Sequence, residues 1–387
     1  MNIRHVVLGA VLALTATAFA DVDWMILPKH SSSGRMLVHG ARYGVSRDGK
    51  NPVRIAPKLY FVTPQTGGKS TKYKYLRLGS ICGVNEKGLA VVWSSGNPTR
   101  DKNPQKKNVN YASHGATVAI LRWCATADEA VRHMRWAVDK RLVSGSSIFL
   151  VADPKRAFVI ECAPKHFASW ELPHAFCVYS NCWKLPGMDD ASVDNANRAT
   201  SNFQREWAAR EALKTTLDEK KNISVADSLR ASRLSVAEVN DKAFSKRRGW
   251  LKLTSAPFNR FSTDSYLFEL DCEFPAELSC VYAALGPQRH TVYLPIPFGA
   301  ADKLPEVLSQ KEWSDEAYRL RDAAKPEDPM RPELLEFESK QLADYAKVRE
   351  EARWLLRLEK RDEALKLLHD TLERQTKETQ EFLTKLK

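Results

Sequence analysis

The 387-residue sequence has no run of 18 apolar residues beyond its N-terminal segment, which excludes a polytopic membrane protein. It contains no Cys-x-x-Cys or His-Glu-x-x-His motif and no close group of His and Cys residues, so the usual zinc sites are not expected. It also lacks the Gly-x-Ser-x-Gly motif, which argues against an α/β-hydrolase nucleophile. The sequence therefore predicts neither a metal nor a cofactor.

Two further absences narrow the possible functions. Residues 63–70 imitate a phosphate-binding loop, but Thr63 stands where the first glycine is required, so we expect a solvated turn. No repeat of 20–50 residues is evident. The formal net charge of +12 suggests anionic partners, yet no nucleic-acid-binding module is recognisable, and we expect no nucleic-acid partner.

The composition is that of an ordinary globular protein. Hydrophobic residues make up 43% of the chain and charged residues 27%, which excludes disordered and fibrous classes. A chain of this length can form one large domain or two modest ones, each with a sizeable core.

The first 20 residues have the pattern of a secretory signal peptide. Arg4 begins a short basic region, residues 6–17 are mostly apolar, and Ala18 and Ala20 supply the small side chains that signal peptidase requires. A short buried helix is the alternative interpretation. Cleavage would give an exported protein, periplasmic or secreted, that begins at Asp21 and retains no transmembrane segment.

Export changes the expectation for the seven cysteines, whose odd number leaves at least one unpaired. Cys272 and Cys280 lie on either side of a hairpin-like connection at residues 273–277 and are the pair most expected to form a disulfide. Cys177 and Cys182 are the next candidates. For each cysteine, burial as a small hydrophobic residue is the alternative.

The order of β-like and helical segments predicts an α+β domain with antiparallel sheets in layers. Helical segments are expected at 114–143, with a new start after Thr126, at 195–245 and beyond residue 304. The β-like runs are 36–38, 58–62, 89–93, 148–151, 157–160, 175–179, 266–270, 278–285 and 290–294.

Residues 331–387 differ in composition from the rest of the chain. They contain no Gly or Cys, one Pro, and thirteen basic and thirteen acidic residues, so the basic excess belongs to the preceding part. A possible turn at residues 360–362 predicts a helical hairpin with one apolar stripe per helix. The stripe is formed by Leu342, Tyr345, Val348, Ala352, Leu355, Ala364, Leu367, Leu368 and Leu372. A cap packed on the main domain and a partner-binding coiled coil both fit this pattern.

Several weak motifs occur in a characteristic order. They are Gly-Val-Asn-Glu-Lys-Gly-Leu-Ala at 83–90, the segments 121–130 and 145–154, Val-Ile-Glu at 159–161, Tyr-Ser-Asn at 179–181, Ala-Leu-Gly-Pro at 284–287 and Val-Tyr-Leu-Pro at 292–295. Together they resemble the N-terminal-nucleophile (Ntn) hydrolases. The resemblance is to the branch of linear-amide C–N hydrolases, with choloylglycine hydrolase-like, acyl-coenzyme A:aminopenicillanate acyltransferase-like and Cys-dipeptidase-like members.

The resemblance implies a four-layer αββα sandwich with a C-terminal helical segment. The implied division is a signal peptide at 1–20, the Ntn-hydrolase-like domain at 21–304 and helices at 305–387. In such proteins the first residue of the mature chain is a Cys, Ser or Thr that attacks an amide, and its own α-amino group serves as the base. The implied substrate is a small amide or peptide.

This chain departs from the family at the nucleophile. Aligning Ser33-Gly34 with the family's Asp-Gly turn places Asp21 at the nucleophile position, and residues 39–43 lack the family's Arg-Asn/Asp pair. A carboxylate is a poor substitute, because the mixed anhydride formed by its attack on an unactivated amide collapses back readily. The resemblance therefore carries an expectation of lost or altered hydrolysis.

Two other positions match the family more closely. The resemblance implies an oxyanion role for Asn181 and a pocket-lining role for Arg260, where a turn Asn and a surface Arg are the alternatives. Asp153 and Glu161 are interpreted as hairpin and sheet-edge residues.

Three hypotheses follow. The first is an exported protein that acts on a small amide or peptide, with Asp21, Asn181 and Arg260 at the reaction centre. The second is a non-catalytic descendant that binds such a ligand, or an envelope partner through its basic face or helical tail. The third, a binder of anionic envelope polymers, rests on net charge alone.

Overall fold

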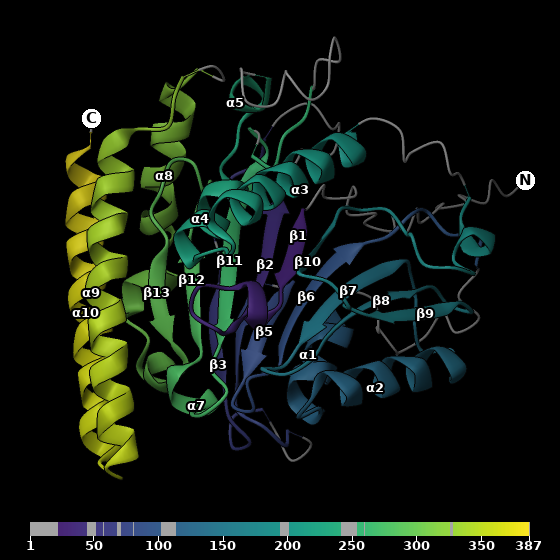
Figure 1. Cartoon of the computed structure of the whole chain (residues 1–387), viewed down its shortest axis with the longest axis horizontal. Helices are drawn as coiled ribbons and strands as arrows, with labels where there is room; N and C mark the ends of the chain where they lie inside the picture. Colours follow the sequence, from purple (N-terminus) through teal and green to yellow (C-terminus); the bar gives the residue numbers. More distant parts are fainter. Residues whose placement is uncertain are drawn as a thin grey trace, which may run out of the picture.

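Two antiparallel β-sheets packed face to face form the centre of the molecule (Figure 1). The structure is a computed structural model that describes residues 22–44, 52–56, 58–67, 71–79, 81–101, 114–193, 201–240, 254–258, 260–325 and 328–386. Asp21 lies outside the described residues.

The first sheet has six strands in the order β10-β1-β2-β11-β12-β13, and the second has seven in the order β3-β4-β5-β6-β7-β8-β9. The first contains β1 Asp23–Ile26, β2 Met36–Tyr43, β10 Phe176–Tyr179, β11 Ser262–Leu270, β12 Cys280–Ala284 and β13 Leu294–Pro297. The second contains β3 Leu59–Val62, β4 Tyr75–Leu78, β5 Cys82–Asn85, β6 Ala90–Ser95, β7 Ser147–Ala152, β8 Ala157–Cys162 and β9 Phe167–Glu171.

The inner faces of the two sheets meet closely. A Cβ atom added at Gly40 of β2 would lie 2.6 Å from Val92 Cγ1 of β6, so this glycine allows the sheets to approach. Apolar side chains from both sheets, such as Val38 and Leu150, share one buried cluster. Side chains from both sheets therefore form the apolar core of the sandwich.

Helices cover the outer faces. α1 (His114–Trp123) and α2 (Ala127–Asp139) pack on the seven-stranded sheet through a separate apolar cluster. α3 (Ser201–Lys220), α4 (Val225–Ser232), α9 (Pro332–Arg357) and α10 (Arg361–Lys385) contact the six-stranded sheet, and α5 (Val236–Asn240), α7 (Pro275–Leu278) and α8 (Lys311–Ala323) complete the described helices. The expected αββα arrangement is confirmed.

Most expected elements are present where the sequence predicts them. The predicted break in the helical segment 114–143 falls at Thr126, whose side chain accepts a hydrogen bond from Glu129 N and caps α2. The helical hairpin is also confirmed, with α9 and α10 side by side along one side of the molecule (Figure 1). Its apolar stripe packs into the main core, so it caps the domain.

Several local predictions are wrong or incomplete, and β1, β4 and β5 are strands at positions where no separate run was predicted. The strand expected at 290–294 instead begins at Leu294, on an edge of the sheet where Pro295 and Pro297 can be accommodated. β9 was not predicted, because it is an edge strand with largely exposed side chains and little hydrophobic patterning. The connection between β11 and β12 contains a one-turn helix, α7.

The predicted disulfides are not formed. Cys272 is an exposed thiol, whereas Cys280 is buried beside Tyr345 and Arg349 of α9. The two side chains therefore lie in different surroundings and are not bonded to each other. Cys177 and Cys182 are likewise buried thiols that are not joined.

None of the helices in the described part of the chain combines the length and apolarity needed to cross a lipid bilayer.

Candidate functional site

The Asp23 carboxyl group is buried between the two sheets at the start of β1. Only 2% of Asp23 is exposed. Its Oδ1 accepts a hydrogen bond from Ala41 N of β2 at 3.2 Å, and its Oδ2 accepts one from the Ser94 hydroxyl of β6. A backbone donor from β2, in the same sheet, and a side-chain donor from β6, in the other sheet, thus fix this carboxyl group.

Burial raises the pKa of Asp23 to about 7, while the hydrogen bonds from Ser94 and Ala41 and the positive charge of Arg205 act in the opposite direction. The carboxyl group therefore changes its protonation state near neutral pH. A proton acceptor or donor with such a pKa is what general acid–base chemistry requires.

Arg205 brings a positive charge to this region from α3. It is 1% exposed, and its guanidinium group donates to Ser201 Oγ and Asn202 Oδ1 and lies 5.6 Å from the centre of the Tyr43 ring. The Tyr43 hydroxyl donates in turn to the carbonyl oxygen of Pro257. These contacts attach the first turn of α3 to β2.

Asn181 lies at the same end of β1 as Asp23. Tyr179 of β10 pairs with Asp23, and Asn181 follows two residues later. Its Nδ2 donates to the carbonyl oxygen and hydroxyl of Ser95, at 3.1 and 3.2 Å. An oxyanion role for Asn181 stays a prediction, and it would require the amide to exchange one of these acceptors for a ligand.

A cavity of about 220 Å³ opens between α3 and the segment that follows β10. Its lining consists of Ser180, Cys182, Trp183, Lys184, Phe203 and Glu206. Lys184 Nζ lies 2.5 Å from Glu206 Oε2, and the Phe203 ring is 53% exposed. The cavity therefore presents a positive and a negative group beside an exposed aromatic ring, next to Asn181.

Arg260 occupies an exposed position two residues before β11, with its guanidinium group 4.9 Å from the centre of the Phe261 ring. It is not among the residues that line the cavity beside Asn181. A pocket-lining role for Arg260 stays a prediction, and so does the placement of Asp21 at the nucleophile position.

Asp153 and Glu161 have structural partners. Asp153 accepts hydrogen bonds from Lys155 N and Arg156 N within the β7–β8 turn, as expected for a hairpin residue. Glu161 is not at a sheet edge: it lies in β8, between β7 and β9, and accepts from Lys184 N and Leu185 N at 2.7 and 3.0 Å. Burial raises the pKa of Glu161 to about 7.

Four buried cysteines have thiol groups with raised pKa values and are therefore not activated as nucleophiles. Burial raises the pKa of Cys177 to about 11 and the pKa values of Cys124, Cys162 and Cys280 to about 12. These side chains stay protonated at neutral pH.

Among the residues that the structure describes, no three His, Cys, Asp or Glu side chains gather closely enough to hold a metal ion.

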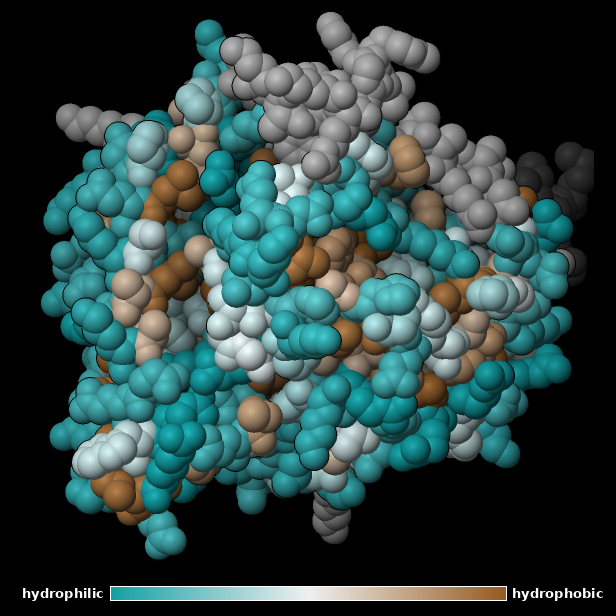
Figure 2. All heavy atoms as spheres, viewed as in Figure 1, coloured by the Kyte–Doolittle hydropathy of each residue, from teal (hydrophilic) through white to brown (hydrophobic). Residues whose placement is uncertain are grey.

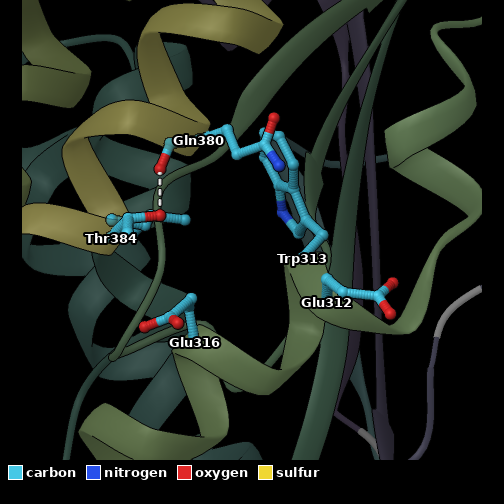
Figure 3. A pocket seen from close by; sticks show the side chains of 6 residues that line it. Glu312, Trp313, Glu316, Gln380 and Thr384 are labelled. Carbon is cyan, nitrogen blue, oxygen red and sulfur yellow. Dashed lines mark hydrogen bonds between the residues drawn. The ribbon is translucent and has the colours of Figure 1, made fainter.

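A smaller cavity of about 80 Å³ lies between α8 and α10 (Figure 3). The Trp313 indole and the side chains of Gln380 and Thr384 surround it, and the Thr384 hydroxyl donates to the Gln380 carbonyl oxygen at 2.8 Å. Its volume is that of a few water molecules. We place the candidate site instead at the cavity of about 220 Å³ beside Asn181, the position that the sequence resemblance singled out.

Sequence reasoning missed Asp23, Ser94 and Arg205. Asp23 sits in an otherwise apolar strand, and a lone acidic residue in such a run is the signal that could have identified it. Ser94 and Arg205 carry no such signal, because their roles depend on the pairing of the sheets and on the placement of α3.

Comparisons with solved structures return a bile acid hydrolase and a penicillin V acylase as similar at low sequence identity and low TM-score. A variant of the conjugated bile acid hydrolase from Clostridium perfringens is 10% identical, with a TM-score of 0.38 over 68% of this chain and 92% of that one. Penicillin V acylase from Agrobacterium tumefaciens is 12% identical, with a TM-score of 0.38 over 75% of this chain and 88% of that one.

A second variant of the Clostridium enzyme is 9% identical, with a TM-score of 0.41 over 68% of this chain and 92% of that one. Neither a protein-family model nor a curated protein sequence matches the chain. The layers of the described residues, two antiparallel sheets between helices, are those that the sequence resemblance implies.

Proposed function

We propose that the protein is an exported descendant of the amide-hydrolase lineage that binds a small amide or peptide without hydrolysing it. The observation that carries this proposal is the cavity between α3 and the segment after β10, with Lys184 and Glu206 at its wall and Asn181 beside it. The cavity begins at Ser180, next to Tyr179, the residue of β10 that pairs with Asp23.

The cavity lining suits a short peptide in particular. Glu206 can accept hydrogen bonds from a ligand ammonium group, and Lys184 can donate to a carboxylate. The exposed Phe203 ring provides an apolar surface for a ligand side chain. Charge-assisted hydrogen bonds of this kind are the stronger ones in binding sites.

Loss of hydrolysis follows from the residue types. The aligned nucleophile position holds Asp21, and a carboxylate forms only a labile anhydride with an amide. The Asp23 carboxyl group is held by Ser94 and Ala41 inside the sandwich, which limits its access to a substrate carbonyl.

Binding can be measured by isothermal titration calorimetry with the dipeptide glycyl-phenylalanine. The substitution Glu206→Gln should weaken binding roughly 10-fold or more, since hydrogen bonds to charged groups contribute about 1.5–3 kcal/mol. Glu219→Gln, on the exposed end of the same helix, is the matched control and should leave binding unchanged. No heat of binding at millimolar peptide, or equal weakening by both substitutions, would refute the proposed site.

A retained hydrolase activity is the second candidate function. The pKa of Asp23, near 7, favours it, because this carboxyl group could exchange a proton with a reacting group at neutral pH. Turnover of amides would distinguish this candidate from the binding protein.

A further inference from the structure

A second cavity, of about 270 Å³, lies on the outer face of the six-stranded sheet, the face turned away from the seven-stranded sheet. The turn after β1, the start of α4 and the middle of α9 enclose it. In the space-filling view, apolar residues gather between the α9–α10 pair on the left and α4 (Figure 2). Asp23 begins β1, whereas Ser32 and Ser33 of this cavity lie beyond the other end of that strand. The two cavities are therefore separate sites.

Two buried donors at this cavity have a weak acceptor or none. Tyr345 is 1% exposed, and its hydroxyl shares a hydrogen bond with the Cys280 thiol, a weak partner, and has no oxygen or nitrogen partner among the described residues. Arg349 is 3% exposed, and its Nε likewise has no acceptor in the described part of the chain. Both side chains line the cavity. Buried donors without acceptors are costly, which favours a ligand that supplies an acceptor.

The first turn of α4 supplies further donors. Ser224 caps this eight-residue helix, and its capping box with Asp227 satisfies the backbone N–H groups of these two residues. The N–H groups of Val225 and Ala226, at the first two helical positions, have no acceptor within the helix. Both residues line the cavity, so the positive end of the helix faces it.

The acceptors at the cavity are already occupied. Glu269 accepts from Tyr282 at 2.7 Å, from Arg349 and from Arg35. Glu350 is paired with Arg35 at 3.3 Å, and its side chain is 61% exposed. A ligand carboxylate could replace this exposed pair without leaving a buried charge alone. The cavity therefore has spare donors, but its acceptors are used.

The remaining wall is apolar. Leu342 and Ala346 of α9 lie one turn apart on the same face of the helix, and both line the cavity. The rings of Tyr282 and Tyr345 pack edge to face, with centroids 6.2 Å apart. An aliphatic chain of several carbons fits such a surface better than a fully hydrated anion would.

We propose that this cavity binds a small organic monocarboxylate with an aliphatic chain. The carboxylate accepts hydrogen bonds from the first turn of α4, from Arg35 and from the Tyr345 hydroxyl, and the chain lies against Leu342 and Ala346. The proposal is independent of ligand binding beside Asn181.

Hexanoate is a suitable probe, with hexanamide and hexylamine as ligands of the same length that lack the negative charge. Isothermal titration calorimetry on the full chain should show binding of hexanoate and at least 10-fold weaker binding of the other two. Tyr345→Phe removes one hydroxyl donor and should weaken hexanoate binding roughly 5-fold or more. Tyr60→Phe, at an exposed position on β3, is the control and should change nothing.

A second substitution tests the location without removing a polar group. Ala346→Phe fills the apolar end of the cavity from an exposed helical position, so folding should be retained and hexanoate binding lost. Absence of hexanoate binding to the wild-type protein at millimolar concentration would overturn the proposal. Equal binding of hexanamide, or wild-type affinity in both Tyr345→Phe and Ala346→Phe, would overturn it as well.

Discussion

Asp23 and Glu161 are buried carboxyl groups whose protonation depends on their surroundings. Burial raises the pKa of each to about 7, because removing the charged form from water outweighs the hydrogen bonds that favour it. In the unfolded chain both groups would have ordinary carboxyl pKa values near 4. Folding therefore takes up protons between pH 4 and pH 7, and the free energy of unfolding falls as the pH rises through this range.

The substitution Asp23→Asn tests this account. It removes the proton uptake of one group, so the variant should lose less stability than the wild type as the pH rises from 4 to 8. The difference in unfolding free energy between the two proteins should change by roughly 4 kcal/mol over this range, since each pKa unit corresponds to about 1.4 kcal/mol. Urea denaturation at several pH values measures it.

Glu171→Gln provides the control, because Glu171 is an exposed carboxylate whose pKa is lowered by the hydrogen bond and charge of Arg156. The difference in unfolding free energy between Glu171→Gln and the wild type should change with pH in the opposite direction and by a much smaller amount. Parallel pH profiles for Asp23→Asn and the wild type would show that Asp23 titrates normally and is not a buried acid.

At the scale of elements, α9 is attached to β11 by a regular series of ion pairs. The helix supplies an arginine at every fourth position, and each pairs with an acidic residue at every second position of the facing segment. The pairs are Arg349 with Glu269, Arg353 with Asp271 and Arg357 with Glu273. Four helical residues rise about 6 Å, close to the roughly 6.8 Å of two strand residues. The helix and the end of β11 therefore keep a similar spacing over the first two pairs, and the turn that follows the strand brings Glu273 to Arg357.

Arg353 is the central residue of this series and the one to substitute. Asp271 is fully buried, and the hydrogen bond and charge of Arg353 help to hold the pKa of this carboxyl group below its usual value. Arg353→Ala should lower the free energy of unfolding by about 3 kcal/mol, because it leaves a buried charge with fewer partners.

The exposed pair of Arg374 with Asp344 joins α10 to α9 and offers a matched comparison. Arg374→Ala should cost less than about 1 kcal/mol by the same denaturation measurement. If Arg353→Ala cost no more than Arg374→Ala, the attachment of α9 would depend on its apolar stripe alone.

The sequence predicted those elements whose patterns are local. The helix break at Thr126 and the turn between α9 and α10 follow from capping and periodicity, and both are confirmed. The strands β9 and β13 were missed or misplaced at the sheet edges, where solvent exposure and proline weaken the alternating pattern. The interior strands β1, β4 and β5 were not predicted separately, because each has only four residues, too few for a clear pattern.

The site was less predictable for a physical reason. The hydrogen-bond partners of Asp23 lie up to 71 positions away in the chain and Arg205 lies still farther, so the burial and raised pKa of Asp23 depend on how the two sheets stack. Asn181 was singled out by resemblance, and the structure adds its contacts with Ser95. The disulfide prediction for Cys272 and Cys280 was wrong because sequence separation does not reveal on which side of a connection each thiol lies.

At the scale of the whole molecule, the account requires export and cleavage. The Ala-x-Ala sequence before Asp21 predicts a mature chain that begins at this residue. Intact-mass analysis and N-terminal sequencing of the exported protein should both give Asp21 as the first residue. A start at Thr17 would restore a hydroxyl nucleophile and favour a working hydrolase. Retention of the full N-terminal segment would instead remove the free α-amino group that the family mechanism needs.

The central claim is that the protein binds amides without hydrolysing them. Its most direct test is a panel of dipeptides, penicillin-type amides and bile-acid conjugates, with product formation followed for the wild type, Asp21→Ala and Asp21→Cys, each with a verified N-terminus. Loss of a nucleophile that works as a unit with its base costs on the order of 10⁶-fold in rate. The account predicts the same low rate of product formation for the wild type and Asp21→Ala. Any rate above the uncatalysed background would come from substrate binding alone. Robust wild-type turnover that Asp21→Ala abolishes would contradict it.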